Sequence, residues 1–346
     1  LGKSAGAADA AVARLEAERI VPRIWARDHT VWGPEPAEIA NRLGWLDSAV
    51  RMTGEVGRLS RFVDAVRADG MRDVLLLGMG GSSLAPEVFR KVFGVRDGFL
   101  DLHVLDSTDP AAVLEAAERL DPARTLVVVP TKSGSTVETL SFMKFFWNRF
   151  IAALGQAKAA SHFVAITDPG SSLEATAKKL GFRHVFAGDP EIGGRYSALS
   201  PFGLVPAALI GADIGRLLDF ALEAVANCEA CNRPKNGDNA GARLGAWIGA
   251  LAREGCDKLT FVLSPAIAPL GVWLEQLIAE STGKNGRGIL PVADEAVGPP
   301  EVYGGDRLFA HIKLGDDATH DAAIARLEAA GHPVVRMGLR DVYDLD

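Results

Sequence analysis

Short apolar runs alternate with helical patterns along much of the chain. Runs near residues 74–77, 102–105, 125–129 and 163–167 each lead through a turn rich in glycine, serine, threonine or aspartate. Each turn opens a stretch with apolar residues three to four positions apart. Strands that alternate with crossover helices are typical of a parallel sheet with helices on both faces. The pattern therefore predicts an α/β fold.

The same alternation returns in the last third of the chain. Apolar runs in "KLTFVLS", "RLFAHIKL" and "HPVVRMGL" frame the helical stretches "GVWLEQLIAEST" and "DAAIARLEAA". A long helical region precedes them and is divided by the loop "NRPKNGDN", where we expect a domain change. We predict an N-terminal helical segment over residues 1–64, a first α/β domain over 65–208, and linking helices with a second α/β domain over 209–346.

Composition narrows the classes of function. The 346 residues are 48% hydrophobic, but no apolar run approaches the roughly 20 residues of a membrane helix, and the start lacks the layout of a signal peptide. We expect a soluble cytoplasmic protein without a membrane partner. The net charge of −7 has no long blocks of one sign, which argues against a nucleic-acid partner. An anionic ligand therefore needs a local site.

The spacing of cysteine and histidine residues does not favour a metal site. Cys228 and Cys231 form a CxxC pair at the end of a helical pattern, without a second pair or histidines nearby. The odd total of three cysteines suits a reducing compartment. The seven histidines are scattered, and His103 and His311 fall inside strand patterns, where we expect packed residues. We expect no metal cofactor.

One strand-to-helix loop with the composition of an anion site is "LLLGMGGSSLAPEVF", which contains Gly81 and Ser82. Glycines let backbone N–H groups approach a ligand, and a helix N-terminus favours an anion. A tight turn without a ligand would use the same glycines. A dinucleotide fingerprint would want a third glycine where this chain has Ser83.

A second loop, "VVVPTKSGSTVET", repeats this geometry with the side chains of Thr131, Lys132, Ser133 and Thr136 before a helical pattern. Hydroxyl and backbone donors at a helix start, with one lysine, suit a phosphate monoester, although the GxxxxGK[ST] spacing is absent. Plain N-capping is the alternative, but it needs only one hydroxyl. Both loops follow strands of one predicted sheet, so we expect a phosphate to bind between them.

Two further charged residues are candidates for chemistry. Arg195 follows two glycines in "GGRYSALSPFGL", where a tight turn can aim a permanent cation, although surface arginines are common. Glu280 shares an apolar helix face with Trp273 and Leu277, near the C-terminal end of the helix. A negative charge is unfavourable at such a position, which is the kind of environment that raises the pKa of a general base. A partly exposed glutamate at a helix end is the alternative. Glu275 lies nearer the opposite face and is expected to be solvated.

Together and in this order, "GMGGSSLAPE", "TKSGSTVET", "GGRYSALSPFGL" and "EQLIAESTGKNGRG" resemble the glucose-6-phosphate isomerase family, which is built from two sugar-isomerase (SIS) domains. The resemblance spans roughly residues 40 to 300. The N-terminal "RIWARDHTVWGPEPAEIANRLGWLD" is similar to the start of the isomerase half of bifunctional transaldolase/glucose-6-phosphate isomerase proteins. That similarity fits a first residue, Leu1, that is not methionine, and a possible fusion to a transaldolase domain.

The resemblance implies two tandem SIS-type domains and a homodimer whose active sites are completed across subunits. By motif match, the phosphate site falls on Gly81 and Ser82 and on the second loop, at Thr131, Lys132, Ser133 and Thr136. Arg195 matches the arginine that stabilises the enediolate. Glu280 matches the catalytic base, and Glu138 matches a glutamate implicated at the family's active site. No redox cofactor is required for the reaction, which moves a proton between C2 and C1 of a sugar phosphate.

Two departures from the family pattern qualify these expectations. The family's ring-opening histidine after the base motif has no counterpart in "GILPVADEAVGPPEVYGGDRLF". The family also continues beyond a segment like "RDVYDLD" into a helical region with an active-site lysine, so we expect weak activity or none if that region is missing from the molecule. The alternatives to an isomerase are a SIS-type sensor that binds a sugar phosphate and a nicotinamide dehydrogenase.

Overall fold

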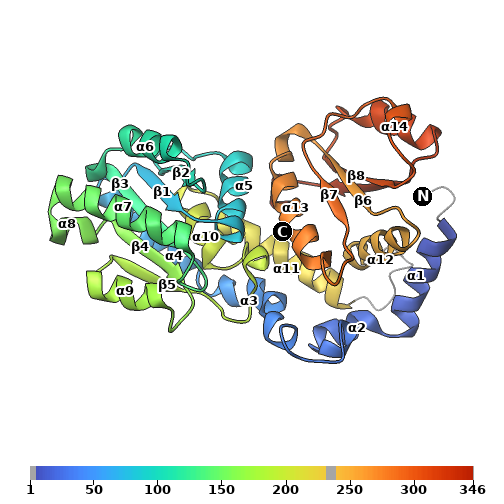
Figure 1. Ribbon diagram of the computed structural model, residues 1–346, viewed down its shortest axis with the longest axis horizontal. Coiled ribbons are helices and arrows are strands. Elements are labelled where there is room, and N and C mark those ends of the chain that lie inside the picture. The colour runs from blue at the N-terminus through green and yellow to red at the C-terminus, as the bar shows by residue number, and fades with distance from the viewer. Residues whose placement is uncertain (1–4, 231–238, 346) are drawn as a thin grey trace. The chain divides into compact units, whose positions relative to one another are not determined.

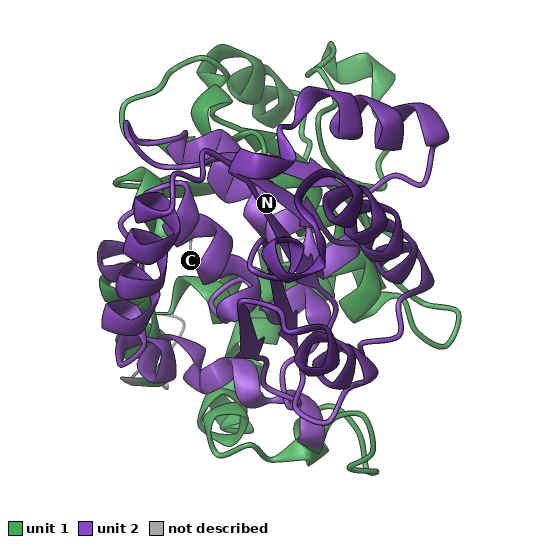
Figure 2. Cartoon of the chain, turned by 90° about the vertical axis from the view of Figure 1, so that its left-hand side faces the viewer, with its two compact units in different colours: residues 1–40, 219–346 green, residues 41–218 purple. Residues whose placement is uncertain are grey.

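The computed structural model describes residues 5–230 and 239–345, which divide into two compact units. Figure 2 distinguishes unit 2, residues 41–218, from unit 1, which combines residues 1–40 with 219–346. Each unit contains one parallel sheet with its own helices, so the predicted α/β class is confirmed (Figure 1).

Unit 2 is built on five strands, and its remaining elements are helices. The strands are β1 (Asp73–Leu77), β2 (Asp101–Leu105), β3 (Thr125–Pro130), β4 (Phe163–Thr167) and β5 (His184–Ala187). The α-helices are α3 (Ser48–Thr53), α4 (Val56–Ala68), α5 (Leu84–Phe93), α6 (Pro110–Arg119), α7 (Val137–Leu154), α8 (Gln156–Ala160), α9 (Ser172–Leu180), α10 (Pro201–Leu209) and the start of α11 (Ile214–Ala230). Short 3-10 helices are η4 (Gly44–Asp47), η5 (Gly80–Ser82), η6 (Pro122–Arg124) and η7 (Gly194–Tyr196).

The sheet of unit 2 has the strand order β2-β1-β3-β4-β5, and every pairing is parallel. Both of its faces are buried, since all six residues of β3 are buried. One face packs against Phe146 and Phe150 of α7, and Phe150 meets the ring of Phe163 edge-on at 5.3 Å. This double burial explains the continuous apolar runs of the sequence.

The long helical pattern after residue 200 is broken into α10 and α11. Gly211 lies between them with φ of +83°, and a Cβ atom there would lie 2.6 Å from the Phe99 ring. The left-handed backbone and the crowding both require glycine. Gly211 therefore fixes the break between α10 and α11, and the spacing of apolar residues in the sequence does not reveal this break.

Unit 1 is built on the four-stranded parallel sheet β7-β6-β8-β9. Its strands are β6 (Lys258–Leu263), β7 (Leu290–Val292), β8 (Arg307–Leu314) and β9 (Val334–Leu339). Its α-helices are α1 (Ala5–Ala17), α2 (Ile20–Trp25), the rest of α11, α12 (Ala240–Arg253), α13 (Leu270–Thr282) and α14 (Asp321–Ala329). Helix α1 packs on α12, which ties the start of the chain to this unit.

Two observations bear on the sequence expectations for cysteine and histidine. Cys231 lies outside the described residues, as does most of the "NRPKNGDN" loop, while the Cys228 carbonyl accepts a hydrogen bond from the Trp25 indole at 3.2 Å. His311 is 2% exposed inside β8, which confirms its expected packing, and His103 is half-buried in β2.

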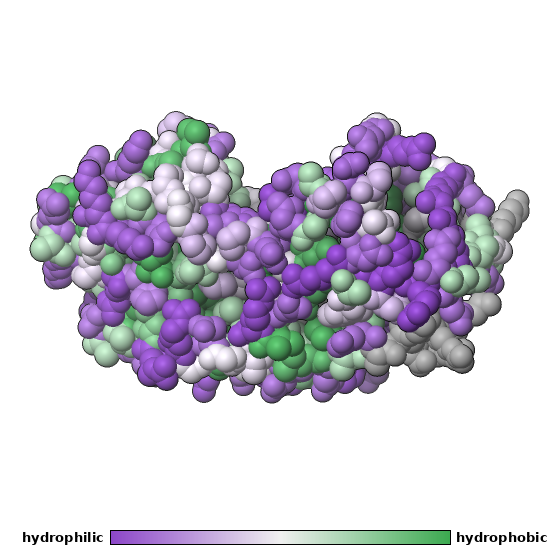
Figure 3. All heavy atoms as spheres, turned by 90° about the horizontal axis from the view of Figure 1, so that it is seen from below, coloured by the Kyte–Doolittle hydropathy of each residue, from purple (hydrophilic) through white to green (hydrophobic). Residues whose placement is uncertain are grey.

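Among the described residues, no helix combines the length and the apolar character needed to cross a membrane. Hydrophilic side chains predominate on the face that Figure 3 shows, with smaller apolar areas between them.

Candidate functional site

The strand order of unit 2 creates a topological switch point between β1 and β3. The chain moves from β1 to β2 on one side and then returns to β3 on the other side of β1. In open α/β sheets, ligands bind in the crevice outside the carboxyl ends of the strands at such a point. The loops that follow β1 and β3 are the two anion-site candidates of the sequence.

The loop after β1 is held against the end of β3 by Gly78. A Cβ atom at this position would lie 2.8 Å from the Ser82 carbonyl oxygen and 3.1 Å from the Pro130 ring. Only glycine lets the backbone pass there, so the two loops lie side by side. Ser82 is half-buried in η5, and helix α5 begins two residues later without a side-chain cap.

The loop after β3 pairs its hydroxyl groups with one another. The hydroxyls of Thr131 and Thr136 are 2.9 Å apart, and those of Ser133 and Ser135 are also 2.9 Å apart. Thr136 occupies the N-cap position of α7, yet its side chain makes no cap hydrogen bond. Plain capping therefore does not account for this hydroxyl, and the positive end of the 18-residue helix α7 keeps its affinity for an anion. Glu138 is half-buried in the first turn of α7.

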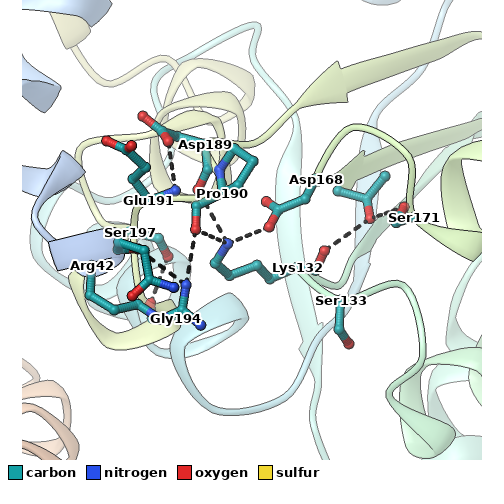
Figure 4. Close-up of polar contacts among 12 residues, drawn as sticks. Arg42, Lys132, Ser133, Asp168, Ser171, Asp189, Pro190, Glu191, Gly194 and Ser197 are labelled. Atoms are coloured by element: carbon teal, nitrogen blue, oxygen red, sulfur yellow. Dashed lines mark hydrogen bonds and ion pairs between the residues drawn. The ribbon is translucent and has the colours of Figure 1, made fainter. Parts of the chain in front are cut away.

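The ammonium of Lys132 is bound within the protein (Figure 4). It forms an ion pair with Asp168 and donates to the carbonyl oxygens of Asp189 and Pro190, each at 3.2 Å. The Pro190 carbonyl also accepts from Arg42 at 3.3 Å. Lys132 thus joins the loop after β3 to the loops after β4 and β5.

Arg195 is placed beside the glycine loop by a contact between backbones. A Cβ atom at Gly81 would overlap the Gly194 carbonyl and lie 2.8 Å from the Arg195 nitrogen. The Arg195 guanidinium lies 5.0 Å from the centroid of the Tyr196 ring, which in turn stacks on Trp45 at 5.4 Å. Arg195, η5 and the switch point therefore belong to one region of unit 2.

The serines after Arg195 fix the start of α10. The Ser197 hydroxyl donates to the Gly194 carbonyl at 2.7 Å. Ser200 is the N-cap of α10, where its hydroxyl accepts from the Phe202 N–H at 3.3 Å, and Pro201 is the first helical residue. A hydroxyl cap and a proline in the first turn thus define where α10 begins.

Glu280 lies in the last turn of α13, in unit 1. Its side chain is exposed and accepts a hydrogen bond from the Gln276 amide at 2.8 Å, while its backbone carbonyl accepts from Lys284 at 2.9 Å. This position matches the alternative of a glutamate at a helix end, so burial does not support a role as base. The expectation for Glu275 is wrong: it is half-buried, and its carboxylate accepts the N–H of Ala293 at 2.9 Å.

One group of possible cation ligands occurs in the described part of the chain. Asp73, Asp101 and His103 bring one ligand atom each to within 4.8 Å of one another, with His103 Nε2 3.0 Å from the Asp73 carboxylate. Sequence spacing does not reveal this group, because β1 and β2 bring it together. Asp73 and Asp101 are the first residues of their strands, at the opposite end from the two candidate loops.

Sequence reasoning missed the residues that hold Lys132. Asp168 directly follows the strand residues 163–167, as Thr131 follows those of β3, so its position at a strand's carboxyl end was a usable signal. The Asp189 and Pro190 carbonyls carried no such signal, since they belong to a backbone turn after the short strand β5.

Comparison with known proteins gives one family. A family model described as phosphoglucose isomerase matches residues 53–291. A glucose-6-phosphate isomerase of Thermus thermophilus is 34% identical over 283 residues, which are 79% of this chain and 64% of that protein. The enzyme of the same name from Rubrobacter xylanophilus is 31% identical over 287 residues, with 78% and 62% covered. The chain thus spans less than two thirds of the length of these relatives.

Two solved structures have a fold similar to that of this chain. A hypothetical protein from Thermus thermophilus superposes with a TM-score of 0.80 at 28% identity, covering 96% of this chain and 86% of that one. A glucose-6-phosphate isomerase from Chlamydia trachomatis gives 0.69 at 21% identity, covering 94% and 70%. The second likeness is one of fold alone.

Proposed function

The chain belongs to the phosphoglucose isomerase family, and from this premise we propose that it interconverts D-glucose 6-phosphate and D-fructose 6-phosphate. The observation that carries the proposal is the switch point of unit 2. Paired hydroxyls, an uncapped helix N-terminus and a glycine loop meet there, and Gly81 seats the Arg195 backbone against them. These are groups suited to a phosphate and to a developing oxyanion.

We assign the phosphate to the two loops of unit 2. The hydroxyls of Ser82, Thr131, Ser133 and Thr136 and the backbone N–H groups near Gly81 and Lys132 are the proposed donors. Binding energy from the phosphate is remote from the reacting carbons, so it can hold the sugar in a reactive orientation. The isomerisation itself needs other groups.

Glu280 is the proposed base, and Arg195 the proposed partner of the enediolate. A carboxylate can take the proton from C2 and return it to C1, and general base catalysis of this kind is typically worth about 10²–10⁴ in rate. A guanidinium stays charged throughout and stabilises the oxyanion without titrating. Glu138, in the first turn of α7, is proposed as a further active-site residue.

A coupled assay of fructose 6-phosphate conversion tests the proposal. It is run on this chain and on a version extended past Asp346, each with and without Glu280→Gln. We expect turnover in the extended wild type and a loss of at least about 10² in its Glu280→Gln variant. An extended wild type that binds the sugar phosphate without turning it over refutes the isomerase and favours a sensor.

We also propose a homodimer, as the family resemblance implies, which light scattering on the purified chain measures. Fusion to a transaldolase domain remains a prediction, and the full open reading frame tests it.

A further inference from the structure

The side chain of Lys132 is engaged at its charged end. Only 24% of the Lys132 side chain and 17% of the Asp168 side chain are exposed. The ammonium carries three donors, and the structure gives it three partners: the Asp168 carboxylate and the carbonyls of Asp189 and Pro190. A fourth partner, such as a phosphate oxygen, would have to displace one of these.

Displacement of Asp168 would be costly. A partly buried carboxylate left without its cation loses far more than an exposed one, because water cannot fully replace the partner. The Oδ1 atom of Asp168 is buried and has no hydrogen-bond partner, and the ammonium of Lys132 pairs with the other oxygen, Oδ2, so Lys132 is the main group that compensates the charge of this carboxylate. The ammonium of Lys132 is thus already paired with groups of unit 2.

Further hydrogen bonds fix the same loop to its neighbours. The Thr131 N–H donates to the Ile166 carbonyl at 3.0 Å, and the Asp168 N–H donates to the Lys132 carbonyl at 3.1 Å. The Ser172 hydroxyl donates to the Gly134 carbonyl at 2.5 Å. Strand β4, the loop after it and the first residue of α9 therefore hold the backbone of residues 131–134, from which the donors of the anion site project.

We propose that Asp168 is a positioning residue for the phosphate loop, residues 131–136. It acts through Lys132, whose side chain anchors the loop to the loops after β4 and β5, while the phosphate is bound by hydroxyl and backbone N–H donors without direct contact with the ammonium. The inference rests on the proposed function, because it refines how that site holds its substrate.

A double-mutant cycle distinguishes two roles of Lys132, as an anchor of the phosphate loop or as a direct ligand of the phosphate. Asp168→Asn and Lys132→Met are made singly and together, and the Kd of inorganic phosphate is measured by calorimetry on the whole chain. Each single change is expected to weaken binding about tenfold, the worth of one charge-assisted hydrogen bond. The double variant is expected to be no weaker than either, since both changes remove one anchor.

The variants would behave differently if the Lys132 ammonium bound the phosphate directly. Asp168→Asn would then release the ammonium, and phosphate binding would be unchanged or tighter, while Lys132→Met alone would weaken it. That result overturns the inference. The fructose 6-phosphate assay adds a second readout: a misplaced loop is expected to raise KM about tenfold with kcat nearly unchanged, because it weakens binding uniformly.

Glu174 and Lys178 supply a matched control pair. They form an i,i+4 ion pair of 2.6 Å on α9, and Lys178 is 67% exposed. Glu174→Gln and Lys178→Met repeat the same chemical changes outside the site, and we expect phosphate affinity within about twofold of wild type. If Asp168→Asn does not fold, Asp168→Glu replaces it. That variant keeps the charge but moves the anchor, and an unchanged Kd there refutes the inference.

The outcomes distinguish this inference from the proposed function. A wild type extended past Asp346 that neither binds phosphate nor converts fructose 6-phosphate overturns both. A wild type that does both, with losses in the cycle that simply add, overturns the positioning role of Asp168 alone.

Discussion

Replacing Gly81 with alanine tests the contact that seats Arg195. The added methyl group would overlap the Gly194 carbonyl and lie 2.8 Å from the Arg195 nitrogen. All of these atoms are backbone, so no side chain can rotate away, and η5 and η7 must separate. The variant thus probes the packing of two loops with the smallest possible insertion.

The expected cost follows from this overlap. Overpacking a tight contact by one methyl group costs about 1–3 kcal/mol, and each kcal/mol lowers the Tm of a domain of 150–250 residues by about 2–4 °C. We expect a fall in Tm of about 2–12 °C. A displacement of about 1 Å at a residue that meets the transition state costs about 10² in rate, and we expect kcat/KM to fall by that order.

Gly194 offers a control in the same contact. A Cβ atom there meets nothing within 4 Å, and its φ is not positive. Gly194→Ala is therefore expected to keep the Tm of the wild type or raise it slightly. Thermal unfolding by circular dichroism and the fructose 6-phosphate assay are run on both variants. If Gly81→Ala matches Gly194→Ala in both measurements, the proposed seating of Arg195 by Gly81 is refuted.

Other expectations concern charge and protonation. Glu280→Gln is expected to lower kcat by about 10²–10⁴ with little change in Tm, because the side chain is exposed, while Glu275→Gln on the same helix keeps its acceptor oxygen and should stay active. Arg195→Lys is expected to lower kcat about 10²–10³, measured in the same assay, whereas undiminished turnover contradicts its role. Burial lowers the pKa of His162 and of His311. Unfolded histidine takes up protons below about pH 6.5, so the unfolding free energy should decline as pH falls from about 7.5 to about 5.5 in urea titrations, and a rise would contradict this.

The strands that sequence reasoning located are those with long apolar runs. The runs near 74–77, 102–105, 125–129 and 163–167 lie in β1 to β4, each within one residue of its observed bounds. Strands β5 and β7 were not predicted, because they have four and three residues and end their sheets on one side. Such short edge strands show no periodicity and gain their structure from the neighbouring strand.

The candidate site, like the fold, could be predicted from sequence only in those features that depend on local composition. Hydroxyls and glycines after β1 and β3 were visible because local composition and position at a strand end are sequence properties. The pairing of Lys132 with Asp168 was not, since it depends on β4 lying next to β3. Nor does sequence reveal that Gly81 faces the backbone at residue 194, a contact between two segments that are far apart along the chain.

The stacking of Trp45 on Tyr196 gives the loop of Arg195 an intrinsic fluorophore. Indole emission depends on the polarity and the aromatic contacts of the ring, and this ring lies 5.4 Å from the direct neighbour of Arg195. The chain has six tryptophans, so the difference between wild type and Trp45→Phe isolates the signal of this one. Movement of the loop on ligand binding can thus be followed in real time without an added label.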